Sequence, residues 1–214
     1  MENLIQVPIN TIMLEGILTI PKNSKGIVIF AHGSGSSRLS PRNNFVAQKL
    51  QKAGIGTLLI DLLTGDEDKI YETRFDITLL TYRLIDIIQW LQKQPKTKNL
   101  SIGLFGASTG AAAALEVAAK LGSKIKAVVS RGGRPDLAMA ILDKVTSPTL
   151  LIVGGNDFGV IELNTQAFEA LKSIKKLEIV NGATHLFEEP GALEKVAQLA
   201  IHWFEKYLKK GGWE

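Results

Sequence analysis

The sequence contains no cysteine among its 214 residues. Disulfide bonds, thiolate zinc sites and a cysteine nucleophile are therefore excluded. Histidine is scarce too: the three histidines lack the short spacing of metal ligands, so we predict neither a metal site nor a bound cofactor. No stretch approaches the ~20 consecutive apolar residues of a membrane helix, so we expect no membrane association. The stretch 1–20 lacks a cleavage-site pattern, which indicates a cytoplasmic protein.

Charge of one sign is not concentrated in any part of the chain. With 25 Lys and Arg against 21 Asp and Glu, the formal net charge is +4. The lysines lie scattered near the ends of predicted elements and form no stripe with aromatic residues, so we predict solvated helix ends and no nucleic-acid partner. A content of 45% hydrophobic and 21% charged residues is typical of a globular chain. We expect one domain over residues 1–214 and a small-molecule substrate. Composition and charge do not predict the oligomeric state.

Strand-like and helix-like segments alternate along the chain. Strands are expected at 4–9, 11–20, 26–31, 56–62, 102–107, 125–130, 149–153 and 177–180. Helices are expected at 41–53, 74–94, 108–121, 137–142, 163–171 and 191–208, with a solvated loop at 64–72. The alternation predicts an α/β fold with a mostly parallel, doubly wound sheet of about eight strands, which begins with an antiparallel edge hairpin. The segment between 130 and 149 is too short for a large cap domain.

One turn in this pattern carries a chemical signal. An apolar strand runs without a loop into an alanine-rich helix, and the turn reads Gly106-Ala107-Ser108-Thr109-Gly110. G-x-S-x-G between a strand and a helix is the pattern of a nucleophile elbow, in which a strained serine projects its hydroxyl from the carboxyl edge of the sheet. The alternative is an ordinary tight turn of small residues. Ser108 is the candidate nucleophile.

An acid and a base follow later strands in the order that such a serine requires. Asp157 comes after the strand at 149–153, and His185 lies in the loop after the strand at 177–180. A serine hydroxyl needs a histidine to take its proton, and the imidazole needs a carboxylate to fix its tautomer. Asp157 could instead be a turn residue, with Glu162 as a weaker substitute. Of the other histidines, His32 is expected in the core and His202 on a helix surface.

Further candidates follow strands at the same predicted edge. The backbone N–H groups of Thr109 and of Ser34, in the small-residue loop 32–37, are the predicted donors to an oxyanion. Arg131 and Arg134 follow the strand at 125–130. Arg134 could pair with Asp136, and either arginine could pair with Glu188 or Glu189 and hold loops together, or could bind an anionic group of the substrate.

Four phrases give the chain a resemblance to the dienelactone-hydrolase-like branch of the α/β-hydrolase superfamily. They are Ala31-His32-Gly33-Ser34-Gly35-Ser36-Ser37, Phe105-Gly106-Ala107-Ser108-Thr109-Gly110, Leu151-Ile152-Val153-Gly154-Gly155 with Asp157, and Gly182-Ala183-Thr184-His185. The resemblance implies an α/β-hydrolase fold and a hydrolase of small soluble esters, thioesters or lactones that acts through an acyl-enzyme. Dienelactone hydrolases proper use a cysteine nucleophile, so the serine here removes support for dienelactone as the substrate. An acyltransferase, or a binding protein that retains the fold without turnover, is the alternative.

Overall fold

The computed structural model describes residues 3–208, which form a single eight-stranded sheet with helices on both faces. The strands are β1 (Asn3–Ile9), β2 (Ile12–Thr19), β3 (Gly26–Ala31), β4 (Gly56–Ile60), β5 (Ser101–Ala107), β6 (Ile125–Arg131), β7 (Thr149–Gly154) and β8 (Lys175–Val180). Their order in the sheet is β1-β2-β4-β3-β5-β6-β7-β8. Strands β3 to β8 pair in parallel, and β2 pairs antiparallel with both β1 and β4. The predicted mostly parallel sheet and edge hairpin are confirmed.

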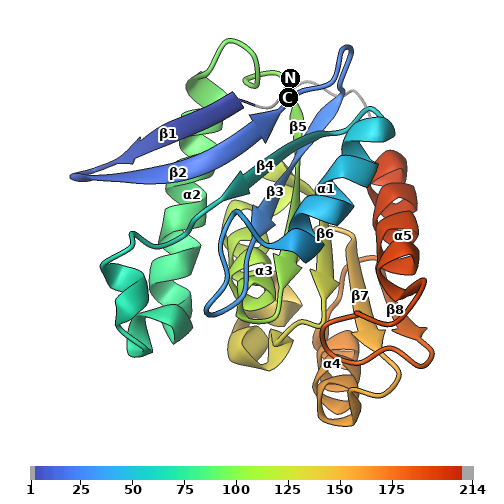
Figure 1. The fold of residues 1–214 in the computed structure, drawn as a ribbon. Coiled ribbons are helices and arrows are strands. Elements are labelled where there is room, and N and C mark those ends of the chain that lie inside the picture. The colour runs from blue at the N-terminus through green and yellow to red at the C-terminus, as the bar shows by residue number, and fades with distance from the viewer. Residues whose placement is uncertain (1–2, 209–214) are drawn as a thin grey trace.

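Helices cover the sheet in two layers (Figure 1). The α-helices are α1 (Pro41–Lys52), α2 (Ile77–Lys93), α3 (Thr109–Leu121), α4 (Phe158–Ala170) and α5 (Ala192–Tyr207). Buried side chains of α1 and α5 form one hydrophobic core against the sheet, and those of α2, α3 and α4 form a second core on the other face. This arrangement explains the continuous apolar runs in β3, β4, β5 and β7, which are buried throughout.

Two helices begin three or more residues away from their predicted starts. Helix α4 begins at Phe158, five residues before the expected start, so Asp157 lies directly at its N-terminus. Helix α2 begins at Ile77 because the carboxylate of Asp76 accepts a hydrogen bond from the N–H of Leu79 and caps the helix. The preceding polar stretch is not an open loop but contains the short 3₁₀ turns η1 (Glu67–Lys69) and η2 (Glu72–Phe75).

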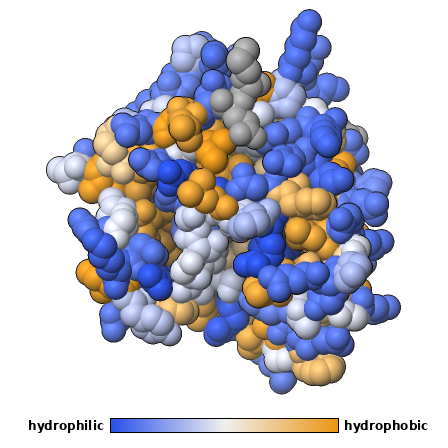
Figure 2. Space-filling model, viewed as in Figure 1, coloured by the Kyte–Doolittle hydropathy of each residue, from blue (hydrophilic) through white to orange (hydrophobic). Residues whose placement is uncertain are grey.

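The carboxyl ends of the parallel strands meet at the lower edge of the molecule in Figure 1, where their loops lie close together. Between β6 and β7 the chain forms only the 3₁₀ helix η4 (Pro135–Lys144), so no large cap is inserted there, as predicted. On the face seen in Figure 2, hydrophilic side chains cover most of the surface and apolar ones form scattered groups. Across residues 3–208, none of the helices combines the length and the apolar character needed to cross a bilayer.

Candidate active site at the carboxyl edge of the sheet

Ser108 lies at the sharp turn between β5 and α3 in a strained backbone conformation. Its φ of 50° and ψ of −123° are rarely adopted by a residue with a side chain. The turn is possible because α3 passes very close to β3: a Cβ atom at Gly110 would collide with the carbonyl oxygens of Ala31 and His32. The glycine on the other side of Ser108 is required for the same reason, because a Cβ at Gly106 would meet the α3 backbone.

Backbone hydrogen bonds tie this turn to the end of β6. The N–H of Ser108 donates to the carbonyl of Arg131 (3.3 Å), and the carbonyl of Ser108 accepts from the N–H of Arg134 (3.1 Å). Ala107 is paired with Arg131 in the sheet. The strained serine is therefore held by the end of β6 and by the loop that follows it, and these bonds stabilise a conformation that the isolated turn would not keep.

Asp157 and His185 form a direct side-chain pair. The Nδ1 atom of His185 lies 2.6 Å from Oδ2 of Asp157, and the side chains are 39% and 17% exposed. Their loops are joined by backbone bonds, because Asn156 N–H donates to the Ala183 carbonyl (2.9 Å) and Gly155 N–H to the Val180 carbonyl (2.8 Å). A carboxylate on Nδ1 fixes the imidazole tautomer and leaves Nε2 as the nitrogen that can take a proton.

Gly132 brings the His185 ring to the same loop that holds Ser108. A Cβ built on Gly132 would lie 3.4 Å from Cε1 and 3.5 Å from Nδ1 of His185, so the ring packs directly on this glycine. Gly132 also donates to the Ile152 carbonyl (2.8 Å), and its neighbour Arg131 accepts from Ser108 N–H. The imidazole and the strained serine thus flank one short turn at the end of β6. The three residues predicted from sequence converge at one edge.

The two predicted oxyanion donors are connected by a side chain. Thr109, the first residue of α3, is 2% exposed, and its Oγ1 accepts a hydrogen bond from the N–H of Ser34 (2.9 Å). The loop that carries Ser34 passes against Ser108, the candidate nucleophile, since a Cβ on Gly33 would lie 3.0 Å from Cβ of Ser108. The N–H groups in the first turn of a helix have no intrahelical partner, so that of Thr109 is a candidate anion donor.

Arg131 lies in the protein interior beneath the His185 loop. The residue is 6% exposed, and its guanidinium donates to Oδ1 of Asn43 on α1 (3.1 Å) and lies 5.8 Å from the centre of the Phe187 ring. Within residues 3–208 no carboxylate forms an ion pair with it, and its buried Nε has no hydrogen-bond partner. Burial, and secondarily the charge of Arg42, lower the pKa of Arg131 to about 10.

Arg134 has the opposite environment, although it lies only three residues further along the chain. It forms two hydrogen bonds with the carboxylate of Asp136 (2.9 and 2.8 Å), and this pairing raises the pKa of the Arg134 guanidinium. Glu188, a second partner considered from sequence, pairs with Arg42 instead (2.9 Å). Arg134 is therefore a surface ion pair near the edge, whereas Arg131 is an interior cation.

The remaining sequence candidates lie outside this group. His32 is buried, donates through Nδ1 to the Gly33 carbonyl (3.0 Å) and accepts through Nε2 from the N–H of Leu62 (3.1 Å). Burial lowers the pKa of His32 below its ordinary value of 6.5. His202 is an exposed residue of α5 that bonds to the Gln198 carbonyl (2.8 Å), and Glu162 contacts Gln166 on the surface of α4. No group of three metal-ligating side chains is found between residues 3 and 208.

Sequence reasoning missed three residues that shape the site. Asn43 is a buried amide on α1 that binds Arg131, and Asn164 on α4 donates to the Gly133 carbonyl (3.0 Å) next to the turn that contacts His185. Phe187 is buried with a φ of 57°, a conformation that its side chain disfavours. A polar residue on the apolar face of a predicted helix could have identified the asparagines, but no local pattern marks Phe187.

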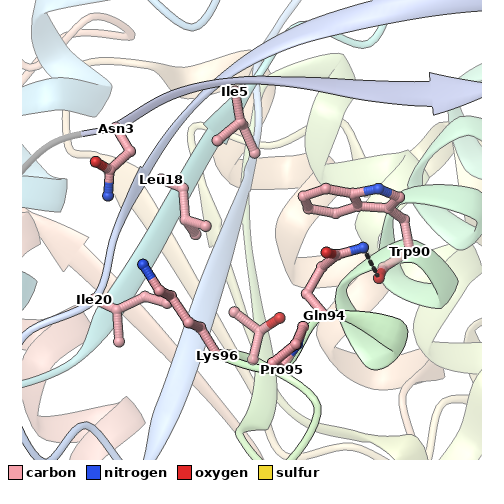
Figure 3. Close-up of a pocket in the computed structure, with 9 residues that line it drawn as sticks. Asn3, Ile5, Leu18, Ile20, Trp90, Gln94, Pro95 and Lys96 are labelled. Carbon is pink, nitrogen blue, oxygen red and sulfur yellow. Dashed lines mark hydrogen bonds between the residues drawn. The ribbon is translucent and has the colours of Figure 1, made fainter.

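Two hollows beside the Ser34 loop are small. One of about 10 Å³ adjoins His32, Gly33 and Ser34, and a neighbouring one of about 140 Å³ is lined by Ser36, Asp61 and Thr64 among others. A far larger hollow of about 720 Å³ lies at the opposite edge of the sheet, between β1, β2 and the end of α2 (Figure 3). The 720 Å³ hollow therefore lies away from the candidate catalytic residues.

An eight-stranded sheet with this strand order and a serine elbow after β5 defines the α/β-hydrolase class of fold. The chain belongs to the dienelactone hydrolase family, whose pattern matches residues 14–209. It is 54% identical to a dienelactone hydrolase from Anabaena variabilis whose crystal structure superposes with a TM-score of 0.95, covering 98% of this chain and 99% of that one. The predicted family is confirmed.

Other relatives extend this comparison. Est1E from Butyrivibrio proteoclasticus, which has also been solved with ferulic acid bound, shares the fold with a TM-score of 0.82 at 18% identity, over 95% of this chain and 98% of that one. Two proteins of Mycobacterium tuberculosis named putative phosphoribosyl transferases are 54% identical over 204 residues. That match covers 95% of this chain but 46% of theirs, so the chain spans about half the length of these relatives.

Proposed function

We propose that the chain is a serine hydrolase of small carboxylic esters, thioesters or lactones, with Ser108 as nucleophile, His185 as base and Asp157 as the acid that orients it. The observation that carries the proposal is the 2.6 Å pair between Asp157 and His185 beside a serine in strained elbow geometry. Membership of the dienelactone hydrolase family supports hydrolysis, and the absence of cysteine leaves serine as the nucleophile.

The reaction follows from the properties of these groups. Ser108 Oγ attacks the substrate carbonyl while His185 Nε2 takes the hydroxyl proton, and the negative charge that develops on the carbonyl oxygen is stabilised by backbone N–H groups. Collapse of the tetrahedral intermediate breaks the bond to the leaving group, which receives the proton from His185. Water then attacks the acyl-enzyme, again through His185, and releases the acid and free Ser108.

The proposed substrate is small, soluble and without an anionic group. Arg131, which is interior, and Arg134, which is engaged by Asp136, support a role in holding loops rather than in binding a substrate anion. The short β6–β7 connection supports an open site that acts without interfacial activation. A preference for an anionic ester that disappears in Arg134→Met, or a sharp rate increase above the micellar threshold of a long-chain ester, would contradict this part of the proposal.

The test combines covalent labelling with turnover. A fluorophosphonate probe should label the wild type on the peptide that contains Ser108, and a panel of chromogenic esters, thioesters and lactones should reveal turnover. Ser108→Ala should lose both, whereas Ser147→Ala, which removes a buried hydroxyl bonded to the Ile125 carbonyl far from the site, should keep both. Labelling or turnover that survives in Ser108→Ala would refute the assignment.

Two other activities are separated by the same assays. An acyltransferase would show faster acyl release with an added alcohol acceptor than with water alone, and a binding protein would show no burst of leaving group. The name of the Mycobacterium tuberculosis relatives suggests a third assay. The protein is incubated with 5-phosphoribosyl 1-diphosphate and nucleobases, and diphosphate release is measured. Release that persists in Ser108→Ala would indicate a second activity independent of the proposed triad.

A further inference from the structure

The hydroxyl of Thr109 bonds to the backbone of a different loop, directly beside Ser108. Thr109 directly follows the proposed nucleophile, and its Oγ1 accepts from the N–H of Ser34 at 2.9 Å across 75 residues of sequence. We propose that Thr109 is a positioning residue whose side chain aligns the N–H of Ser34 for oxyanion stabilisation. This inference rests on the proposed function.

The loop that contains Ser34 needs such an anchor. It includes Gly33 and Gly35, the latter with a φ of 67°, so its backbone has access to conformations that other residues disfavour. Within the loop, Ser36 N–H donates to the Gly33 carbonyl (3.1 Å), which closes a turn but does not fix the turn against α3. The hydrogen bond to Thr109 supplies that connection.

Thr109 is well suited to hold the loop. It is almost fully buried at the start of α3, and a β-branched side chain has restricted χ1 freedom, so Oγ1 is held in place by the elbow itself. The hydroxyl engages Ser34 N–H as an acceptor in the free protein. During reaction the same N–H is shared with the developing oxyanion, while the N–H of Thr109 supplies the other donor. No reorientation of the loop is then required in the transition state.

The decisive variant is Thr109→Val, which keeps the shape of the side chain and removes the acceptor. Loss of a complete oxyanion donor typically lowers kcat by about 10²–10³-fold, so misalignment of one should lower kcat by roughly 10–100-fold with KM within about twofold. Thr109→Ser restores an acceptor and should recover kcat to within about threefold of wild type. Thr97→Val is the matched control, because Thr97 is also buried and bonds the Leu91 carbonyl (2.6 Å) at the other end of the sheet.

Two readouts separate positioning from a general structural effect. The rate ratio between an ester and its thiono analogue should fall in Thr109→Val, because a thiocarbonyl sulfur gains less from N–H donors than an oxyanion does. Amide hydrogen exchange at Ser34 should accelerate in Thr109→Val and remain slow in Thr109→Ser and Thr97→Val. The exchange measurement tests the anchor without any substrate.

Several results would overturn the inference. A Thr109→Val protein with wild-type or higher kcat would show that the hydroxyl is dispensable or competes for Ser34. If Thr109→Val and Thr97→Val lowered kcat equally, or if Thr109→Ser did not recover kcat, the hydrogen bond between Ser34 and Thr109 would have a structural role only. If the wild type shows no Ser108-dependent turnover, the proposed function fails and the catalytic part of this inference fails with it. Wild-type turnover with an unaffected Thr109→Val variant refutes the inference alone.

Discussion

The two edges of the sheet differ in the hollows beside them and in the candidate catalytic groups that they carry. Beside the Ser34 loop the carboxyl edge has two small cavities of about 10 and 140 Å³, and this edge carries the strained Ser108 and the His185–Asp157 pair. The amino edge has a hollow of about 720 Å³ around Trp90, lined largely by aliphatic and amide side chains. Strain and converging polar groups, rather than volume, therefore distinguish the candidate catalytic edge.

The topology of the fold explains this difference. All six parallel strands direct their carboxyl ends and the N-termini of the following helices to one edge, where backbone donors and side chains from separate loops meet. At the other edge, strand starts meet helix ends, and a hollow lies between residues of β1 and β2 and the end of α2. The first edge is built by many precise contacts, so single substitutions there should have large effects.

The largest effect is expected from Asp157→Asn. An amide in place of the carboxylate can hold His185 in the wrong tautomer and cannot stabilise the imidazolium, and in comparable triads this lowers kcat by about 10⁴-fold. Steady-state kinetics on an ester that the wild type hydrolyses, together with a thermal melt, measures the change. Glu162→Gln is the control, since Glu162 is exposed on α4 and contacts Gln166, so it should retain full activity. If Glu162→Gln lowered kcat as much as Asp157→Asn, the assignment of Asp157 as the acid would be wrong.

An intermediate effect is expected from Arg131→Lys. An ammonium is more strongly hydrated than a guanidinium and cannot span Asn43 and Phe187 together, so its burial should lower the free energy of unfolding by about 2–3 kcal/mol. Urea denaturation measures the difference. Arg134→Lys, at a surface pair with Asp136, should change the free energy of unfolding by less than about 1 kcal/mol. Equal losses in both variants would mean that the interior position of Arg131 has no energetic consequence.

The fold and the candidate triad residues could be predicted because short, continuous sequence patterns indicate both. The apolar run before Ser108, the small residues around it and the alanines after it specify a strand, a sharp turn and a close-packed helix in continuous sequence. Asp157 and His185 each follow a strand, and parallel topology brings such positions to one edge. Their roles in catalysis remain predictions.

The rest depends on contacts between distant segments, which no local pattern encodes. The burial of Arg131 results from α1 and the His185 loop closing over it, and the sequence left its environment open between surface pairing and substrate binding. The hydrogen bond between Ser34 and Thr109 depends on how two loops meet. No apolar stripe marks the start of α4, because Phe158 in its first turn is 75% exposed and the next residue, Gly159, is a weak helix former.

A smaller effect should appear when the pH is lowered. Because burial lowers the pKa of His32 below 6.5, the folded protein keeps it neutral while the unfolded chain takes up a proton. Unfolding is therefore favoured as the pH falls below 6.5, by at most about 1.4 kcal/mol per pH unit for one group. Urea titrations between about pH 5 and 7.5 should show a shallower slope in His32→Gln than in wild type. His202→Gln, at an exposed position, should keep the wild-type slope, and an unchanged slope in His32→Gln would contradict the argument.

The smallest effect is expected at the amino edge. The hollow around Trp90 and Lys96 is separated from Ser108 by the length of β5, which at ~3.3 Å per residue amounts to about 20 Å. Lys96→Gln removes the charge at this hollow and Ile20→Phe narrows it, and neither change touches a loop of the carboxyl edge. Both variants should keep kcat/KM within about twofold of wild type. If kcat/KM fell about tenfold in either variant while the melting temperature stayed unchanged, the amino edge would influence catalysis at the carboxyl edge, and the functional difference between the edges would not hold.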